Sequence, residues 1–239
     1  MDKIKAKVIE IKEISERIKI FKLNWEGIEK FNFKAGQFIN LSDDNFKDEE
    51  GKIIKRPYSI ANSPLEKKYL ELCIAKGQKF SKHLFEKIKK GDILNVEGPF
   101  GIFFLKETNI KDTESKLVFI AGGTGIAPLI SMIRTLIKQE YNEEINLFYS
   151  IRNSEDYAYK EELENISKQN KKFKLIMTCT RTCNEWKGKT GRITTFIEDH
   201  IKKNWITYIC GPKKMAEDIS KILGKKGVDE EKKYCRKIE

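Results

Sequence analysis

Two short motifs in this chain carry residue types suited to binding a flat ring and phosphates. The first is Arg56-Pro57-Tyr58-Ser59, which offers a planar cation, an aromatic face and a hydroxyl along one expected strand. A guanidinium binds phosphate through paired hydrogen bonds, and an aromatic face can stack on a planar ring. The second, Gly122-Gly-Thr-Gly-Ile-Ala-Pro128, follows an apolar strand and opens a helical pattern, as a phosphate-binding turn does. Together they predict that a flavin meets a nicotinamide nucleotide.

The glycine-rich turn departs from the usual G-x-G-x-x-G fingerprint, so its residues alone predict only a phosphate-binding turn. Farther along, Tyr208-Ile-Cys-Gly-Pro212 ends a strong apolar strand. A cysteine buried before a turn is the simpler interpretation of Cys210. The alternative is a ligand contact, because ligands of open α/β sheets bind at the carboxyl ends of strands.

Arginine is rare in this chain, where only seven of the 47 basic residues are arginine. Arg152, Arg181 and Arg192 each lie at or beyond the expected carboxyl end of a parallel strand. Three cations on one edge suit a dianion, such as the 2′-phosphate that distinguishes NADP from NAD. The alternative is that they are surface or helix-capping arginines. We favour NADPH, with NADH as the other possibility.

The first hundred residues are typical of short strands separated by polar turns, which indicates a small antiparallel barrel. One helix is expected from about Ser81, as N-cap, to Lys89, and the polar insert Ser42–Lys55 is expected to be a mobile loop. The expected strands are Ile4–Ile11, Ile18–Leu23, Gly36–Leu41, Tyr58–Ala61, Tyr69–Lys76 and Ile93–Glu97.

The pattern then changes to alternating strands and helices, which predicts a parallel sheet covered by helices on both faces. The charged stretch Lys106–Ser115 has no apolar rhythm, so we predict domains at 1–108 and 109–239. The expected strands are Leu117–Ala121, Asn146–Ile151, Phe173–Thr178 and Trp205–Cys210. The expected helices are Ile126–Gln139, Tyr159–Lys168, Thr194–Ile201 and Lys214–Leu223.

Composition narrows the class of protein further. The 239 residues suit two domains, and no apolar run approaches the roughly 20 residues that span a bilayer. The beginning of the chain does not read as a signal peptide, and the five cysteines lack paired metal spacing, so we expect a cytoplasmic protein with free thiols and no metal. The net charge of +11 indicates either a lysine-rich solvated surface or a docking face for an acidic partner. Nucleic acid is disfavoured, because no basic run alternates with stacking aromatics.

Arg56-Pro-Tyr-Ser-Ile-Ala-Asn-Ser-Pro64 resembles the flavin motif of the ferredoxin–NADP reductase family, and the resemblance covers essentially the whole chain. It includes Leu72-Cys-Ile-Ala-Lys-Gly77 and Glu97-Gly-Pro-Phe-Gly101 in the same order. The resemblance implies a barrel that binds FAD, with FMN as the minor possibility. It places Arg56 on the phosphates, Tyr58 against the isoalloxazine and Ser59 near flavin N5. It assigns the pyrophosphate to segments containing Ile74, Lys76, Lys79, Phe80 and Ser81.

The same resemblance implies that the second domain binds the nicotinamide nucleotide. Thr124, between Gly123 and Gly125, would lie close to the pyrophosphate. Cys210, followed by Gly211 and Pro212, would lie beside the nicotinamide C4, where it would contribute packing and polarity. Relatives usually end with a glutamate and an aromatic residue; this chain has Arg236 and Ile238 at the nearest positions, which leaves the contribution of the carboxyl terminus open.

The resulting interpretation is an oxidoreductase in which hydride passes from NADPH to FAD, helped by Ser59 and Cys210, and single electrons then pass to ferredoxin or flavodoxin. One alternative is the NADH-linked reductase component of an oxygenase or another multi-subunit redox complex. The other is a non-catalytic flavin-binding regulatory module. His83 and His200 are poor catalytic candidates, since each lies in a helical pattern and flavin hydride chemistry needs no side-chain base.

Overall fold

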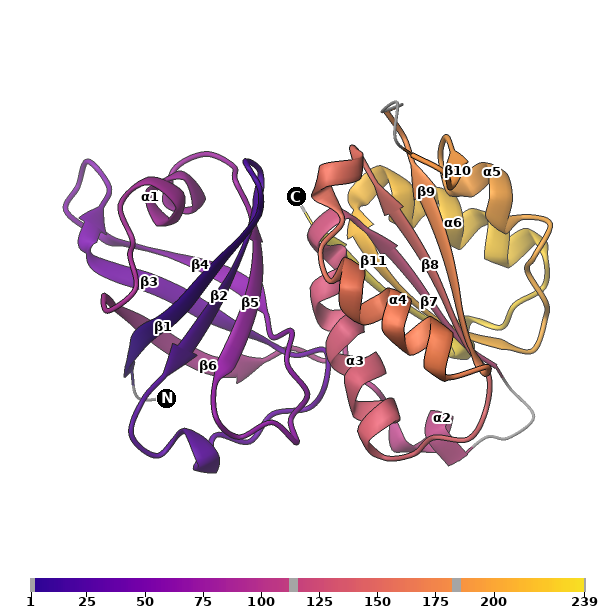
Figure 1. Ribbon diagram of the computed structural model, residues 1–239, viewed down its shortest axis with the longest axis horizontal. Coiled ribbons are helices and arrows are strands. Elements are labelled where there is room, and N and C mark those ends of the chain that lie inside the picture. Colours follow the sequence, from indigo (N-terminus) through magenta and orange to yellow (C-terminus); the bar gives the residue numbers. More distant parts are fainter. Residues whose placement is uncertain (1–2, 112–115, 182–185, 239) are drawn as a thin grey trace. The chain divides into compact units, whose positions relative to one another are not determined.

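The computed structural model describes residues 3–111, 116–181 and 186–238, which form two compact units (Figure 1). The first unit contains Met1–Phe104 together with Ile130–Lys138, and the second contains Leu105–Leu129 together with Gln139–Glu239. One helical segment from later in the chain thus groups with the first unit, and the domain boundary at residue 108 stays a prediction. Within the described ranges, no helix is long and apolar enough to cross a bilayer.

A six-stranded antiparallel sheet forms the first unit, as predicted, in the order β4-β3-β6-β1-β2-β5. The strands are β1 Ile4–Ser15, β2 Ile18–Asn24, β3 Phe38–Lys47, β4 Ile53–Ser59, β5 Leu70–Ala75 and β6 Ile93–Phe100. A single bridge between Ile60 and Leu72 joins the two outer strands and closes the barrel. Apolar side chains fill its interior because they alternate inward along each strand; among them, Phe21, Ile39 and Val96 have no exposed surface.

The prediction of a mobile loop over Ser42–Lys55 is wrong. These residues extend β3 and β4 into a hairpin, with Lys47 opposite Ile53. Asp48 stabilises the turn, since its Oδ1 accepts hydrogen bonds from the backbone N–H groups of Glu50 and Lys52 at 3.1 and 2.8 Å. Polar residues therefore occupy strands here because the pairing and the aspartate turn satisfy the backbone.

The predicted N-cap of the first helix is also wrong. The helix α1 spans Phe80–Glu86, and its N-cap is Lys79, which has a φ of 53°. Ser81 lies inside the helix, where its hydroxyl accepts a hydrogen bond from the Gly77 N–H at 3.0 Å and donates to the Gln78 carbonyl at 3.2 Å. The hydroxyl thus stabilises the turn before the helix instead of its first free N–H groups.

The second unit contains the predicted parallel sheet, in the order β10-β9-β8-β7-β11-β12. Its strands are β7 Lys116–Gly122, β8 Ile145–Ile151, β9 Phe173–Cys179, β10 Lys189–Thr190, β11 Trp205–Pro212 and β12 Lys233–Ile238. The α-helices are α2 Glu107–Lys111, α3 Ile126–Lys138, α4 Lys160–Gln169, α5 Thr194–Ile197 and α6 Lys213–Lys225. Single 3₁₀ turns are η1 Ile28–Lys30 in the first unit and η2 Gly123–Gly125, η3 Ser154–Asp156 and η4 Glu230–Lys232 in the second.

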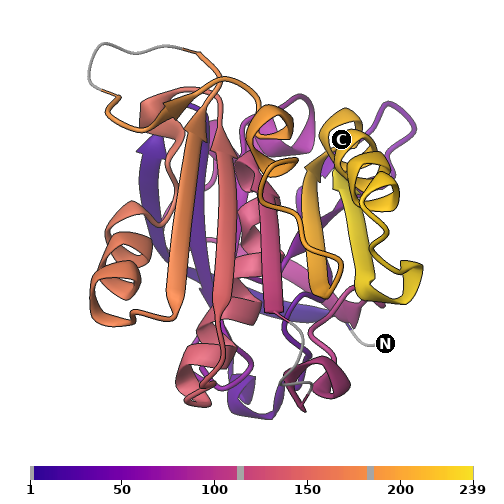
Figure 2. The same cartoon turned by 90° about the vertical axis from the view of Figure 1, so that its right-hand side faces the viewer.

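Helices cover the parallel sheet on both faces, and α5 and α6 lie together on one of them (Figure 2). Ile197 of α5 and Ile219 of α6 share a buried cluster with Ile209 of β11. This arrangement leaves the carboxyl ends of the strands and the loops that follow them as one edge, where the glycine-rich turn and the three arginines lie.

Candidate functional site

The Arg56–Ser59 motif forms the last four residues of β4. Arg56 is exposed, and its Nη1 donates to the Lys55 carbonyl at 2.9 Å. Tyr58 is half-buried and packs against the barrel core, with its ring centroid 6.5 Å from that of Phe80. Burial raises the pKa of Tyr58, so its hydroxyl is neutral at physiological pH. An exposed guanidinium and a partly open, uncharged ring therefore lie two residues apart on one face of the strand.

The segment predicted to hold a pyrophosphate divides into exposed and buried residues. Lys76 and Lys79 are exposed, and Ser81 is half-buried. Ile74 and Phe80 have only 1% and 0% of their surface exposed, because both point into the barrel core. These two can offer a ligand only their backbone groups, whereas the lysines can offer charge.

The glycine-rich turn lies between β7 and α3 and fits a phosphate. Gly123 has a φ of +54°, and a Cβ added there would meet nothing within 4 Å, so open space lies above its backbone. A Cβ on Gly125 would lie 2.2 Å from the Cys210 carbonyl oxygen, so the turn is packed directly against the end of β11. Thr124 between them is half-buried. Glycines thus supply both the open face and the close backbone approach that such a turn needs.

Cys210 is fully buried at the carboxyl end of β11, next to this turn. Burial raises the pKa of its thiol to about 12, while the positive charge of Arg236 opposes the shift. Below that pH the thiol keeps its proton, so Cys210 contributes packing and polarity and is not a nucleophile. Gly211 after it is buried, and Pro212 is exposed.

Arg236 belongs to β12, a strand that the sequence patterns missed. It lies opposite Cys210 in the parallel register of β11 and β12. In the same pair of strands, the rings of Tyr208 and Tyr234 are stacked, with centroids 4.7 Å apart and planes 17° apart. The carboxyl-terminal segment therefore adds a cation beside Cys210, and its sequence Lys-Tyr-Cys-Arg-Lys-Ile has no regular alternation from which the strand could be predicted.

Two of the three arginines predicted to meet a phosphate lie on adjacent backbone segments. The Arg181 N–H donates to the Arg152 carbonyl at 2.8 Å, and both side chains are exposed. Arg192 is exposed after the short strand β10; Lys214 and, less strongly, Arg192 lower the pKa of Asp218. All three follow strands at one edge of the sheet, while residues 182–185 between them lie outside the described chain.

His83 has a structural setting in the barrel. Its Nε2 lies 2.7 Å from the buried Asp43 carboxylate, and its ring stacks on Phe46 with centroids 4.5 Å apart. The contact joins α1 to β3. This histidine, which the sequence had set aside as a catalytic candidate, therefore anchors the helix that follows the Lys76–Lys79 segment.

Comparison with known proteins identifies both units. Residues 5–105 match a family described as the oxidoreductase FAD-binding domain, and residues 119–221 match the oxidoreductase NAD-binding domain. The chain belongs to the ferredoxin–NADP reductase family. Its first unit is accordingly an FAD-binding domain and its second an NAD(P)-binding domain, and the resemblance seen in the sequence is confirmed.

The most similar curated proteins include components of oxygenases. The chain is 32% identical to the "Phenol hydroxylase P5 protein" of Acinetobacter pittii over 225 residues, which cover 91% of this chain and 60% of that protein. It is 28% identical to the "Anthranilate 1,2-dioxygenase electron transfer component" of Acinetobacter baylyi, and the match covers 99% of this chain and 67% of that protein. The chain thus spans about half to two thirds of the length of such relatives.

Solved structures show the same two-domain fold. The cytochrome P450 reductase GcoB of Amycolatopsis aligns with a TM-score of 0.86 and 26% identity, covering 99% of this chain and 69% of that one. A ferredoxin NADP+ reductase from Neisseria gonorrhoeae, solved with bound FAD and NADP, aligns with a TM-score of 0.79 and 23% identity. The alignment covers 95% of this chain and 92% of that one. The second comparison supports the fold alone.

Proposed function

We propose that this protein passes hydride from NADPH to FAD and then delivers single electrons to a small acidic carrier such as ferredoxin or flavodoxin. The observation that carries the proposal is that one chain combines the Arg56–Ser59 motif in an FAD-binding domain with the glycine-rich turn in an NAD(P)-binding domain. A bound FAD supplies the redox chemistry, because it accepts two electrons as hydride and releases them singly. The protein supplies binding and orientation.

In the first unit, Arg56 would bind the FAD phosphates, and the partly open ring of Tyr58 would lie against the isoalloxazine. Pro57 fixes the backbone between them, and Ser59 would place its hydroxyl near N5. Backbone groups of Ile74 and Phe80, with Lys76, Lys79 and Ser81, would line the pyrophosphate.

In the second unit, the open backbone of Gly123 and the hydroxyl of Thr124 would hold the nucleotide phosphates. Gly125 lets this turn approach the end of β11, where Cys210, Gly211 and Pro212 would lie against the nicotinamide. The neutral thiol of Cys210 offers a weakly polar surface there. Its role would be to help hold the nicotinamide in the position from which hydride can transfer.

Anaerobic mixing with NADPH tests the proposal directly. The purified protein loaded with FAD is expected to lose its visible flavin absorption when NADPH is added, and to regain it when ferredoxin or flavodoxin is supplied. A protein that binds FAD yet keeps its absorption would instead be the non-catalytic module. A protein that reduces its flavin only with NADH would support the oxygenase-component alternative, which the phenol hydroxylase and anthranilate dioxygenase relatives favour.

The choice of NADPH over NADH rests on the exposed arginines of the sheet edge. We expect the double substitution Arg181→Ala with Arg192→Ala to lower kcat/KM for NADPH by at least about 100-fold, since charge-assisted bonds contribute about 1.5–3 kcal/mol each. The value for NADH should change little. Steady-state reduction of ferricyanide with each nucleotide measures this, and Arg17→Ala provides a control arginine in the other unit. Equal losses with both nucleotides would contradict the assignment.

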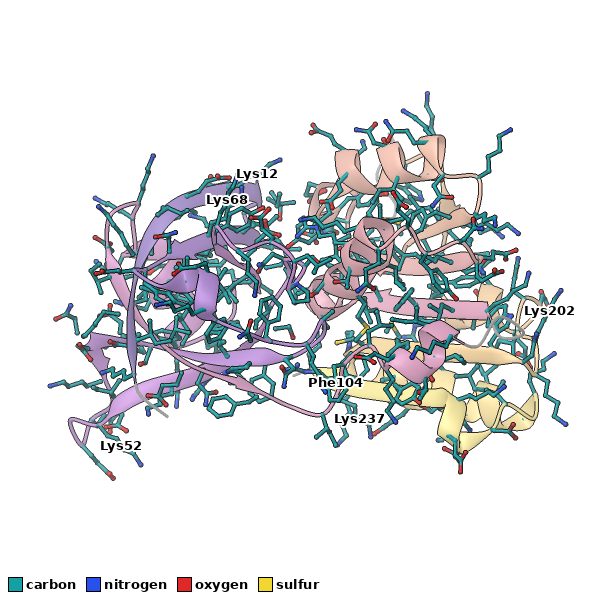
Figure 3. All side chains as sticks on the ribbon, turned by 90° about the horizontal axis from the view of Figure 1, so that it is seen from below. Lys12, Lys52, Lys68, Phe104, Lys202 and Lys237 are labelled. Atoms are coloured by element: carbon teal, nitrogen blue, oxygen red, sulfur yellow. The ribbon has the colours of Figure 1, made fainter. Side chains whose placement is uncertain are left out.

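The lysine-rich surface supports an acidic partner. Lys12, Lys52 and Lys68 project outward from the first unit, and Lys202 and Lys237 from the second (Figure 3). Such a field raises encounter rates with an acidic protein and is screened by salt. Cys210 and Cys235 form no disulfide, which supports our proposal that the protein works in the reducing cytoplasm.

A further inference from the structure

The carboxyl-terminal strand β12 places a cation in the part of the second unit that is proposed to hold the nicotinamide. Arg236 of β12 lies opposite Cys210 of β11, and Cys210 lies opposite Ala121 of β7. We propose that Arg236 makes the second unit bind the reduced nicotinamide nucleotide in preference to the oxidised one. This inference rests on the proposed function, which puts the nicotinamide against Cys210, and it adds a specificity-determining residue to that site.

Ala121, Cys210 and Arg236 form a row across one face of the sheet. An aromatic row lies two residues earlier in the same three strands. Its rings on β7 and β11 are stacked with centroids 5.6 Å apart, and those on β11 and β12 with centroids 4.7 Å apart, so opposed side chains share a face here. Side chains two positions apart in a strand lie on the same face. Arg236 therefore lies on the Cys210 face of the sheet, at the carboxyl ends of the strands.

The guanidinium of Arg236 acts electrostatically on Cys210. Its positive charge opposes the rise that burial causes in the pKa of the Cys210 thiol, as a nearby cation does. Burial also lowers the pKa of Arg236, but a guanidinium stays protonated at neutral pH. Ala121 and Cys210 have no exposed surface, whereas Arg236 is half-buried, so Arg236 is the member of the row that reaches the surface. A nicotinamide ring seated at this end of β11 would therefore face a positive charge.

The strand that carries Arg236 is held on both faces of the sheet. On the Cys210 face, Tyr234 belongs to the aromatic row, and the Lys106 Nζ lies 4.7 Å from the centroid of its ring. On the other face, the Lys237 Nζ lies 3.0 Å from the Glu217 carboxylate of α6. These contacts and the pairing with β11 fix the backbone position of Arg236 beside Cys210. The cation thus belongs to an ordered part of the site.

The oxidised and reduced nucleotides differ in the charge of one ring. The nicotinamide ring of NADP+ carries a positive charge, whereas the ring of NADPH is neutral, and the phosphates of the two forms are the same. Arg236 would therefore attract the phosphates of both forms alike and repel only the oxidised ring. Because unit charges a few ångströms apart interact strongly even at an effective dielectric constant of about 20, this repulsion should weaken NADP+ binding about tenfold. The preference would also reduce inhibition by the oxidised product.

The test compares Arg236→Gln with Lys237→Gln, which removes a cation from the next residue of β12 on the opposite face of the sheet. The FAD-loaded proteins are titrated by calorimetry with NADP+ and with tetrahydro-NADP, a reduced analogue whose ring is uncharged and which cannot donate hydride. The ratio of the two affinities should shift about tenfold toward NADP+ in Arg236→Gln. The ratio should be unchanged in Lys237→Gln, and Arg236→Lys, which keeps the charge, should stay close to the wild type.

A third ligand separates an effect on the ring from an effect on the phosphates. The nucleotide 2′-phospho-AMP has no nicotinamide, so its affinity should change in Arg236→Gln only as much as that of tetrahydro-NADP does. If Arg236→Gln weakens all three ligands by the same factor, Arg236 binds a phosphate and the inference is wrong. The wild type provides a check that needs no variant, since it should bind tetrahydro-NADP more tightly than NADP+; the reverse order would also overturn the inference.

The possible outcomes separate this inference from the proposed function. If the wild-type protein binds neither NADP+ nor tetrahydro-NADP, the proposed function is wrong and the role of Arg236 falls with it. If the wild type binds both ligands and Arg236→Gln has the same affinity ratio, the role of Arg236 alone is wrong. A shift of the ratio in Arg236→Gln that Lys237→Gln reproduces would come from the overall charge of the protein, which contradicts the inference as well.

Discussion

Alanine at position 125 is expected to disrupt the nucleotide turn of the second unit. The added Cβ would lie 2.2 Å from the Cys210 carbonyl oxygen, 2.6 Å from its carbon and 2.8 Å from the Gly211 Cα. All three are backbone atoms, so no side-chain rotation can relieve the overlap. Overpacking of this kind costs about 1–3 kcal/mol, and we expect the upper end for Gly125→Ala. Because the turn and the end of β11 must separate, the affinity for NADPH should fall by more than about tenfold.

Gly123→Ala is the matched control for this prediction. A Cβ there meets nothing within 4 Å, but the φ of +54° is unfavourable for alanine. The cost is therefore conformational, about 1–2 kcal/mol, without a clash. Urea unfolding and NADPH titration of both variants measure the difference. Equal stability losses at the two glycines, or an unaltered NADPH affinity in Gly125→Ala, would show that the turn is not packed against β11 as described.

The parallel sheet could be predicted because its central strands are apolar on both faces. Both strands lie between layers of helix, so Leu117–Ala121 is a continuous apolar run and Trp205–Cys210 is interrupted only by Thr207. The barrel strands could be predicted from alternation and turn residues in the same way. In both units, the elements that could be predicted are those whose side chains are buried, because burial requires apolar residues at regular positions in the sequence.

Elements stabilised by backbone pairing left weaker signals. The strand β12 contains two lysines, an arginine and a cysteine among its six residues, and its place in the sheet depends on hydrogen bonds to β11. The hairpin within Ser42–Lys55 likewise has polar side chains, and its strands extend because β3 and β4 pair with one another. Neither requires an apolar face, so neither has an apolar rhythm.

The candidate site shows the same contrast. Arg56, Tyr58 and the glycine-rich turn could be selected because their residue types are unusual for the structural positions that they occupy. The support around them could not be selected in this way: for example, the side-chain amide of Gln37 donates to the backbone carbonyl of Gly101, and the two residues are 64 apart in sequence. Contacts of that kind depend on strand register, which side-chain patterns leave unspecified.

Removal of the guanidinium of Arg56 is the second substitution with a large expected effect. Arg56→Ala should weaken FAD binding about 10- to 100-fold, since a hydrogen bond to a charged group contributes about 1.5–3 kcal/mol. The stability of the protein without FAD should change little, because the side chain is exposed and its hydrogen bond in the structure is to the neighbouring Lys55 carbonyl. Quenching of flavin fluorescence during titration measures the affinity, and thermal unfolding measures the stability.

Two further variants give this prediction its specificity. Arg56→Lys keeps the charge but loses the planar fork, so its FAD affinity should lie between those of the wild type and Arg56→Ala. Arg17→Ala removes another exposed arginine of the same unit and should bind FAD as the wild type does. Raising salt should narrow the difference between Arg56→Ala and the wild type, because screening weakens the phosphate contact that only the wild type makes. If all three variants bind FAD equally well, the FAD phosphates are held elsewhere, and the motif at the end of β4 has only a structural role in the barrel.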